Sequence, residues 1–485
     1  MNWRELGNQF IFNPDEPLLF HQGIFLFLFS IFLIVYSYSV KTKNYRQFFI
    51  ILFSAYFYYK ASGAFLFLLL TTITFDYLFS IWIEKQTNNL RRKILLAIAI
   101  IFSLSFLMYF KYKNFFLDNI LSYTGKNSIL ETIILPIGIS FYTFQSISYL
   151  VDIYSKKVGR PKFTNYLMYM MFFPHLVAGP IVRAKDFLPQ LNEKFSLSKL
   201  HLNEALYLIF KGLIKKAIIA DYVAQYSDIV FSAPDGFSGI ELLLASLCYT
   251  LQIFCDFSGY TDMAIGISLL LGYRLCLNFD SPYKAKNISD FWRRWHISLS
   301  TWLRDYIYIP LGGNRKGFQL QLFFLFLTML LGGFWHGADW KFIFWGAAHG
   351  VLLILHKIWR KIIGEKIIGS WFFYFSWAIT FSCVSLLWIP FRANSMIDTL
   401  LIYKKIFTDL NLSMLKSIIE TNPLMIIILI GGFLMTVMPS SLKYKLIQAY
   451  YRQDLFIKMV LFIIFIQIMI QMRSADIQPF IYFQF

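Results

Sequence analysis

The stretch QLFFLFLTMLLGGFWHGADWKFIFWGAAHG, residues 321–350, joins two apolar runs through a short segment of glycines and polar residues. Apolar runs of this kind predict helices at membrane depth. His336 lies between the two runs, and a histidine at that depth is costly to bury and usually faces a cavity or a partner. The glycines on both sides of it allow other backbone or a substrate to approach closely. We therefore predict His336 as a catalytic residue, with Trp335 and Asp339 in supporting positions.

The composition extends this interpretation to the whole chain. Of 485 residues, 58% are hydrophobic and only 15% are charged, and the mean hydropathy is +0.56. Soluble proteins carry about a quarter charged residues and roughly half apolar ones. Apolar runs recur from end to end and predict about eleven to thirteen membrane helices. The sequence therefore predicts an all-α polytopic membrane protein with one integral-membrane domain over residues 1–485, and it excludes a single-span or peripheral protein.

The basic residues follow a pattern typical of membrane topology. The formal net charge is +18, and Lys and Arg occupy short segments between apolar runs, so we predict no nucleic-acid partner. Clusters at 41–46 and 85–93 follow the first and third runs and are assigned to the cytoplasmic side. A cluster at 443–458 precedes the last run, so both termini, with a tail at 473–485, are predicted to be extracytoplasmic. The four cysteines have no CxxC spacing, and no metal site is predicted.

Helix breakers and polar groups interrupt three apolar segments, at 135–144, 173–183 and 254–266. Irregular backbone at membrane depth is tolerated only where it is buried in protein or lines a cavity, so several breaks imply an internal passage. The run 239–272 would be about 50 Å long as one helix, and we expect it to break near Gly259. Asp256 and Asp262 need partners at that depth. Asp262 lies one helical turn from Ser258, and Arg274 is close by; both carboxylates are predicted as tunnel or supporting residues.

The polar insertion 273–317 mixes tryptophans with arginines, a pattern typical of amphipathic helices in the headgroup zone. His296 lies in the middle of it. A neutral imidazole such as that of His336 can take the proton from a hydroxyl that attacks an activated acyl group. A second polar group can orient it or stabilise the oxyanion. We predict His296 as that second catalytic residue, if folding brings the insertion against the helix that ends at His336.

Four segments carry a resemblance to a known family: WRRWHISLSTWLRDYIYIPLGG (292–313), GGFWHGADW (332–340), DFSGYTDMAIG (256–266) and FPHLVAGPIVR (173–183). They closely resemble the membrane-bound O-acyltransferase superfamily, specifically its bacterial alginate O-acetyltransferase-like branch. The resemblance implies re-entrant or interfacial helices around a central tunnel, in a bundle whose motif-rich core covers 130–360. The family's essential histidine carries over to His336, and a second position of the branch carries over to His296.

The resemblance also implies an activity. Relatives in this branch acetylate alginate, peptidoglycan or other exported polysaccharides, usually with an extracytoplasmic SGNH-type partner that completes the transfer. For this chain it implies O-acetylation of an exported glycan at the bacterial inner membrane, with cytoplasmic acetyl-CoA as acyl donor, membrane lipids as surroundings, and no bound cofactor or metal. Basic residues at the cytoplasmic mouth would suit the phosphates of coenzyme A.

The last six residues, FIYFQF, resemble the C-terminal motif of the small single-span partner in the teichoic acid D-alanylation system. Our hypothesis is that Tyr482 takes an acyl group at His336 and relays it to a partner protein. The alternative is an aromatic anchor at the membrane interface, which tyrosines at membrane boundaries commonly provide.

Two other functions stay open at this point. The first is transfer of D-alanine or another acyl group to teichoic acid, a lipid or a peptide. The second belongs to another class: a transporter or a non-catalytic membrane scaffold whose broken helices bind a solute at mid-membrane. Transporters of that kind often carry paired broken segments in two halves, whereas the motif regions of this chain differ from one another.

Overall fold

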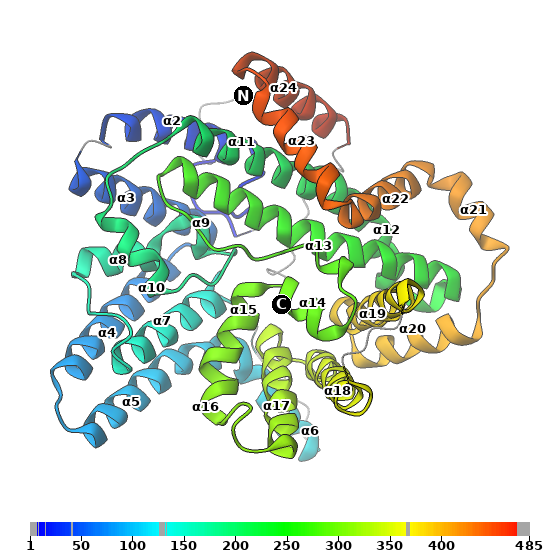
Figure 1. Cartoon of the computed structure of the whole chain (residues 1–485), viewed down its shortest axis with the longest axis horizontal. Coiled ribbons are helices and arrows are strands. Elements are labelled where there is room, and N and C mark those ends of the chain that lie inside the picture. The colour runs from blue at the N-terminus through cyan, green and yellow to red at the C-terminus, as the bar shows by residue number, and fades with distance from the viewer. Residues whose placement is uncertain are drawn as a thin grey trace. The chain divides into compact units, whose positions relative to one another are not determined.

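The computed structural model describes residues 7, 9–14, 16–39, 42–125, 131, 133–364 and 369–472, and these residues form helices and connecting loops without a strand. Figure 1 shows the helices coloured along the chain, and the described part divides into two compact units. Unit 1 contains residues 1–205 and 263–276, and unit 2 contains residues 206–262 and 277–485. An all-α fold is the expected solution for a chain this apolar, because a helix satisfies every backbone hydrogen bond within its own segment.

Unit 1 begins with a series of long apolar helices and continues with shorter ones. Its helices are α2 (Gly23–Ser39), α3 (Lys43–Ser62), α4 (Phe65–Lys85), α5 (Asn89–Leu107), η1 (Met108–Tyr112), α6 (Lys113–Tyr123), α7 (Ile139–Tyr154), α8 (Phe163–Met171), α9 (Phe173–Leu176), α10 (Ala184–Phe187), η2 (Leu188–Asn192) and the first part of α11 (Lys199–Leu213). The last residues of α13 (Gly239–Leu270) also belong to this unit.

Two of the three predicted helix breaks lie in unit 1, and the structure confirms both. Gly138 precedes α7 with φ +80°, and a Cβ there would lie 2.6 Å from the carbonyl oxygen of Leu176, so this turn requires glycine. The segment 173–183 forms only the single turn α9 before it becomes irregular. All of its residues are buried, which is where irregular backbone is tolerated in a membrane protein.

Unit 2 contains the second half of the chain. Its helices are the end of α11, η3 (Ile214–Ala220), α12 (Asp221–Ser232), η4 (Pro234–Gly236), most of α13, η5 (Pro282–Lys284), α14 (Ile288–Arg294), α15 (Ile297–Leu303), η6 (Arg304–Tyr308), α16 (Ile309–Leu311), α17 (Phe318–His336), α18 (Trp340–Ile363), α19 (Gly369–Arg392), α20 (Met396–Thr408), α21 (Met414–Thr421), α22 (Pro423–Val437), α23 (Ser440–Arg452) and α24 (Leu455–Met472). Helix α18 packs against α14, α17 and α19.

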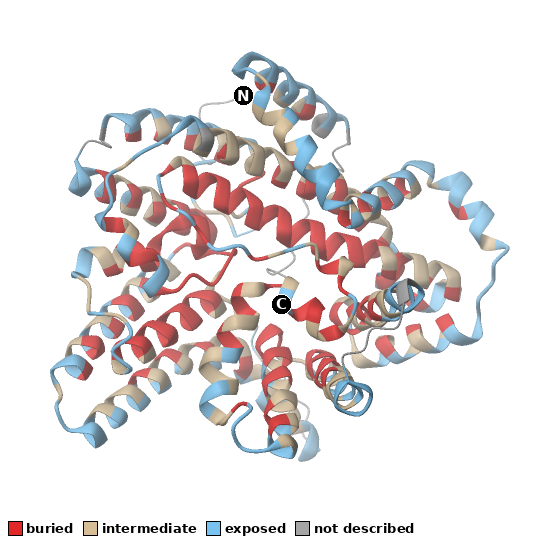
Figure 2. Ribbon diagram, in the orientation of Figure 1, coloured by how far each residue is buried: buried red, intermediate tan, exposed pale blue. Residues whose placement is uncertain are grey.

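The predicted break near Gly259 is wrong, because α13 is one continuous helix of 32 residues. It is buried along most of its length (Figure 2). A Cβ at Gly259 would lie 2.8 Å from the carbonyl oxygen of Gly212, so this glycine allows close packing of η3 and its neighbours on α13. Glycine lowers helix stability by only about 1 kcal/mol, and burial of the surrounding helix offsets that cost.

The structure bears out a multi-pass membrane protein, with fewer long helices than the sequence predicts. In the described part six helices are long and apolar enough to cross a membrane: Phe65–Lys85, Asn89–Tyr123, Gly239–Leu270, Phe318–His336, Trp340–Ile363 and Trp371–Arg392. A seventh span is possible if the pair α21 and α22, bent by 94°, counts as one. Several other predicted runs form shorter helices, such as α7 with 16 residues and α8 with nine.

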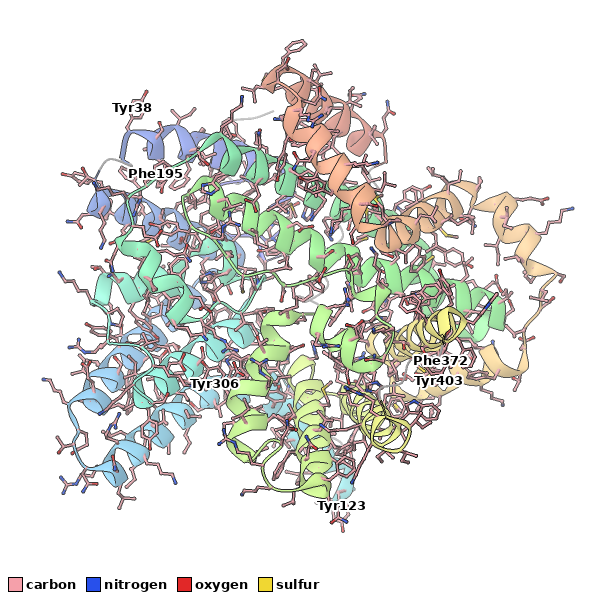
Figure 3. All side chains as sticks on the ribbon, in the orientation of Figure 1. Tyr38, Tyr123, Phe195, Tyr306, Phe372 and Tyr403 are labelled. Carbon is pink, nitrogen blue, oxygen red and sulfur yellow. The ribbon has the colours of Figure 1, made fainter. Side chains whose placement is uncertain are left out.

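Aromatic side chains point outward from several helices, as expected for a protein surrounded by lipid and its interface. Figure 3 labels three of them: Tyr38 and Tyr123 in unit 1, which are 83% and 94% exposed, and Phe372 in unit 2.

The insertion 273–317 forms the predicted short helices, but its tryptophans are not at a headgroup surface. Trp292, Trp295 and Trp302 are all buried within unit 2. Trp295 packs against Phe291 and Trp388, with ring centroids 5.6 and 4.8 Å away. The prediction of interfacial helices is therefore corrected for these side chains, because aromatic packing inside the protein buries them more fully than a headgroup layer would.

Candidate active site

The helical hairpin of α17 and α18 is packed closely at its closed end. A Cβ on Gly333 would clash with the carbonyl of Phe342 and with Gly346, and one on Gly337 would clash with the ring of Phe342. Backbone therefore meets backbone where the two helices adjoin, and larger residues would push them apart. The hairpin places His336, the last residue of α17, at a defined position beside α18.

Aromatic rings surround His336, which is 5% exposed. Its imidazole lies against Trp335, Trp345 and Phe391, with ring centroids 4.9, 5.0 and 5.1 Å away. The interplanar angles of 71°, 86° and 72° are edge-to-face arrangements. The imidazole of His336 is thus held among three aromatic rings.

His296 is fully buried at the start of α15 and has an unusual backbone conformation, with φ +42° and ψ +55°. A left-handed conformation costs a residue other than glycine about 1–3 kcal/mol and persists only where the surroundings hold it. Here the side chain of Asn278 holds it, because its Oδ1 atom lies 3.1 Å from Nδ1 of His296. Burial lowers the pKa of His296 to about 3, so this residue is neutral at physiological pH.

The ring of Trp335 lies near both histidines. Its ring centroid lies 4.9 Å from that of His336 and 6.3 Å from that of His296. The structure therefore places both predicted catalytic residues near one indole, although they come from different elements of unit 2. Trp335 is itself a predicted supporting residue, and that role stays a prediction.

His349 lies in the same apolar stretch as His336 but is not among the predicted site residues. His349 is fully buried on α18, and its Nδ1 accepts a hydrogen bond from Nε1 of Trp292 at 3.3 Å. Its ring also packs against Trp345, 4.7 Å away, which in turn contacts His336. Trp345 and His349 are four residues apart, so both side chains lie on one face of the helix. This spacing could have identified them as candidate site residues.

The two predicted carboxylates lie in ion pairs with lysines. Asp256 pairs with Lys216 at 2.8 Å, and both side chains are 3% exposed. Asp262 pairs with Lys215 at 2.8 Å and with Lys211 at 2.9 Å.

Sequence reasoning missed these three lysines as partners. Three lysines within six residues of an apolar run (KGLIKK, 211–216) were the available signal, because buried cations also need partners. Lys215 donates to Ser258 at 3.0 Å as well as pairing with Asp262. Arg274, the cation expected near Asp262, instead pairs with Glu204 at 2.9 Å in unit 1.

Asp339 lies at the N-cap of α18, where its Oδ1 accepts a hydrogen bond from the backbone N–H of Lys341 at 2.9 Å. An N-cap of this kind stabilises a helix by about 1 kcal/mol. Asp339 therefore holds the start of α18, and with it the closed end of the hairpin. Tyr482, the predicted acyl relay, lies outside the described residues.

A cavity of about 640 Å³ lies within unit 2, between the insertion and the far ends of α17 and α18. Five basic residues are among those that line it: Arg293, Arg304, Lys357, Arg360 and Lys361. Trp292 lines it as well, and so contacts both the cavity and His349. Met329 also lines it and precedes His336 by seven residues, about 10 Å along α17. The elements that line this cavity thus continue directly to the histidines.

The sequence of this chain is similar to those of several known proteins. The chain is 36% identical to the peptidoglycan O-acetyltransferase of Helicobacter pylori over 425 residues, 80% of this chain and 79% of the relative. It is 39% identical to the probable alginate O-acetylase of Pseudomonas aeruginosa over 401 residues, 81% of this chain and 75% of the relative. The teichoic acid D-alanyltransferase of Bacillus subtilis is 31% identical over 240 residues, 46% of this chain and 60% of that protein.

The family model described as MBOAT, membrane-bound O-acyltransferase family, matches residues 51–389. This range includes both histidines, Trp335 and the basic cavity. The chain belongs to the membrane-bound O-acyltransferase family.

Proposed function

We propose that this O-acyltransferase transfers an acetyl group from cytoplasmic acetyl-CoA to hydroxyl groups of an exported polysaccharide. The observation that carries the proposal is the pair of buried histidines, His336 and His296, both near the ring of Trp335. Acyl transfer to a hydroxyl needs a base near the attacking oxygen, and a neutral imidazole is the side chain most often used for that task. Both histidines are catalytic residues in this proposal.

The reaction follows from these groups. The attacking hydroxyl, which is that of Tyr482 in the relay hypothesis, gives its proton to an imidazole as its oxygen attacks the carbonyl carbon of the thioester. A carbon–oxygen bond forms and a tetrahedral oxyanion results, which then collapses with loss of the carbon–sulfur bond. The thiolate of coenzyme A takes up the proton and leaves as the thiol. The surrounding rings of Trp335, Trp345 and Phe391 keep water away from the acyl group.

The basic cavity is our proposed site for the phosphates of the donor. Arg and Lys side chains bind phosphate oxygens through charge-assisted hydrogen bonds, and the cavity supplies five such cations. Arg304 is partly neutralised by Asp305 at 2.7 Å, and Nζ of Lys361 lies 3.9 Å from the ring centroid of Phe318. A donor bound there by its phosphates would extend its acyl end along α17 and α18 toward His336.

The acceptor is proposed from the relatives. The peptidoglycan and alginate proteins match about four fifths of this chain, whereas the D-alanyltransferase matches less than half of it. These proportions favour an acetylated polysaccharide over D-alanylated teichoic acid, a lipid or a peptide. They also favour an enzyme over a transporter or scaffold, since the relatives with high coverage carry the names of acetyltransferases.

The arrangement across the membrane is also part of the proposal. The donor is charged and cytoplasmic and the polysaccharide is exported, so only the small acyl group needs to cross, through a central tunnel. We place the protein in the bacterial inner membrane with both termini outside, by the distribution of its basic loops. An SGNH-type protein outside is the proposed partner, and Tyr482 in the tail 473–485 is the proposed relay to it.

Ester-linked acetate on the exported polysaccharides of the host tests the function. We expect a deletion strain and a His336→Ala strain, the latter with wild-type membrane levels of the protein, to lose the same ester. The glycan that loses its ester identifies the acceptor. Wild-type ester in the His336→Ala strain, together with loss in the deletion strain, would assign His336 a structural role and contradict the proposal.

A matched pair of strains separates the relay from the anchor hypothesis for the tail. Tyr482→Phe keeps the aromatic ring but removes the hydroxyl group that would carry the acyl group. We expect this variant to lose ester formation while the protein stays in the membrane at normal levels. Full activity of Tyr482→Phe would overturn the relay and leave the interfacial anchor.

A further inference from the structure

Asn278 is a fully buried residue of the insertion, and its side chain contacts His296 and Ser298. Its Oδ1 atom receives the backbone N–H of Ser298 at 3.2 Å and the hydroxyl of Ser298 at 2.8 Å. The same atom lies 3.1 Å from Nδ1 of His296. The backbone carbonyl of Asn278 also accepts a hydrogen bond from the N–H of Ile297 at 2.9 Å. One residue thus contacts three consecutive residues at the start of α15.

The backbone contact determines which way the amide of Asn278 points. A backbone N–H can only donate, so the atom facing the N–H of Ser298 is an acceptor and must be the amide oxygen and not the nitrogen. An amide oxygen cannot donate a hydrogen bond. Nδ1 of His296, which faces the same oxygen, must therefore carry the proton of that contact.

A neutral imidazole carries one proton, and its position decides what the other nitrogen can do. With the proton on Nδ1, Nε2 of His296 holds a lone pair. A lone pair accepts a proton, whereas stabilisation of an oxyanion needs an N–H donor. The contacts of Asn278 thereby distinguish the two roles that a second polar group can have beside His336.

We propose that Asn278 is a positioning residue that holds His296 in the Nδ1–H tautomer, so that His296 acts as a proton acceptor and not as an oxyanion donor. Its catalytic consequence rests on the proposed function, in which His296 takes part in acyl transfer. Asn278 also holds the left-handed backbone of His296 through the two backbone contacts at Ile297 and Ser298. The contacts of Asn278 thus determine both the orientation of the His296 ring and the position of its proton.

Solid-state ¹⁵N NMR of histidine-labelled protein in lipid vesicles tests the tautomer without reference to activity. The chain has seven histidines, and a His296→Gln sample identifies the signals of His296 by difference. We expect the wild type to show a protonated Nδ1 and an unprotonated Nε2 at this residue. Asn278→Asp keeps an acceptor oxygen and should preserve that pattern, whereas Asn278→Leu removes it and should give a mixture of tautomers.

Acetyl transfer by the same variants tests the consequence. We expect Asn278→Leu to lower kcat about 100-fold with little change in the KM of the donor, as for loss of other groups that orient a functional histidine. Asn278→Asp should recover most of that loss. Asn165→Leu is the matched control, since Asn165 bonds to Gln47 in unit 1 and should leave kcat near that of the wild type.

Two results would overturn the positioning role: a protonated Nε2 at His296 in the wild type, or an unchanged tautomer in Asn278→Leu. A tautomer that responds to Asn278→Leu while kcat stays the same has a different meaning. It would confirm the positioning role of Asn278 and contradict the proposed function of His296, so the two failures are distinguishable.

Discussion

Unit 2 buries polar side chains in two different ways. The carboxylates Asp256 and Asp262 lie in ion pairs with lysines at 2.8–2.9 Å, and each charge is neutralised by its partner. The histidines His296 and His336 lie among aromatic rings and around Trp335. The charge of a buried carboxylate in an ion pair is already balanced by its partner. A neutral imidazole among aromatic rings can still exchange a proton with a substrate. The comparison predicts that loss of a carboxylate affects mainly stability and that loss of a histidine affects mainly the chemistry.

Loss of His336 should have the largest effect. We expect His336→Ala to lower the rate of acetyl transfer by at least about 10³-fold, because the variant lacks the proposed base while the hairpin stays packed. Membrane vesicles with acetyl-CoA and a polysaccharide acceptor provide the measurement. His201→Gln, a histidine at the start of α11 and outside the site, is the control and should keep full activity. If His336→Ala transferred acetyl groups as fast as His201→Gln, His336 would not be the base, and the proposed difference between the histidines and the carboxylates would be wrong.

Disruption of a buried ion pair should affect stability instead. Asp256→Leu leaves Lys216 with Asp221 as its remaining carboxylate, at 2.8 Å. We expect the free energy of unfolding to fall by about 3 kcal/mol, near the lower end of the range for a broken buried pair. The double variant Asp256→Leu, Lys216→Met should recover much of that loss. Thermal unfolding in detergent measures both, and a stable Asp256→Leu with no acetyl transfer would instead place Asp256 in the chemistry.

The close packing that supports His336 can be tested at a glycine. Gly333→Ala would place a methyl group against the carbonyl of Phe342, and we expect it to lower the free energy of unfolding by about 2 kcal/mol. Gly431→Ala is the matched control, since that glycine is also in an apolar helix but a Cβ there would meet nothing within 4 Å. The control should be neutral or slightly stabilising. Equal thermal stability of the two variants would show that α17 and α18 can move apart without loss of stability.

The buried neutral state of His296 predicts a pH dependence of stability. Its pKa is about 3 in the folded protein and about 6.5 in the unfolded chain. Between these values only the unfolded chain binds the proton, so the free energy of unfolding should fall as the pH decreases below 6.5, by up to about 1.4 kcal/mol per pH unit. The difference between wild type and His296→Gln, measured by chemical denaturation at pH 7 and pH 5.5, isolates this contribution. A difference that does not change with pH would contradict a buried neutral His296.

The basic cavity should give the smallest effect. We expect Arg360→Glu to raise the KM for acetyl-CoA about tenfold with little change in kcat, because it removes one charge-assisted contact with a phosphate far from the reacting atoms. Arg452→Glu, on α23 and outside the cavity, is the control for a change in net charge. A large loss of kcat with unchanged KM in Arg360→Glu would place the donor elsewhere.

The fold class and the centre of the site could be predicted from the sequence because their signals are local. Apolar runs predict membrane helices, and a histidine among glycines at their junction predicts a functional position. The partners of Asp256 and Asp262 could not be predicted in this way. Lys216 and Lys215 lie about 40 residues away in the sequence, and only the packing of η3 on α13 brings them within 3 Å of the carboxylates.

The continuity of α13 shows the same limit. Gly259 predicts a break when only its own helix is considered, because glycine weakens a helix and the run is too long for one span. In the structure that glycine allows the backbone of Gly212 to approach, and the helix continues to Leu270. Whether a glycine breaks a helix or allows another element to pack closely depends on the neighbour, which a sequence pattern does not contain.

The sequence by itself determined that this protein is an all-α membrane O-acyltransferase and predicted His336 as a catalytic residue, since hydropathy and motif spacing are properties of neighbouring residues. Only the tertiary structure decided that His296 lies near Trp335, that Asn278 faces Nδ1 of His296, and that five basic side chains line one cavity. The physical reason is that proton position, ion pairing and phosphate binding depend on distances of about 3 Å. Such distances between residues far apart in the chain exist only after the helices have packed.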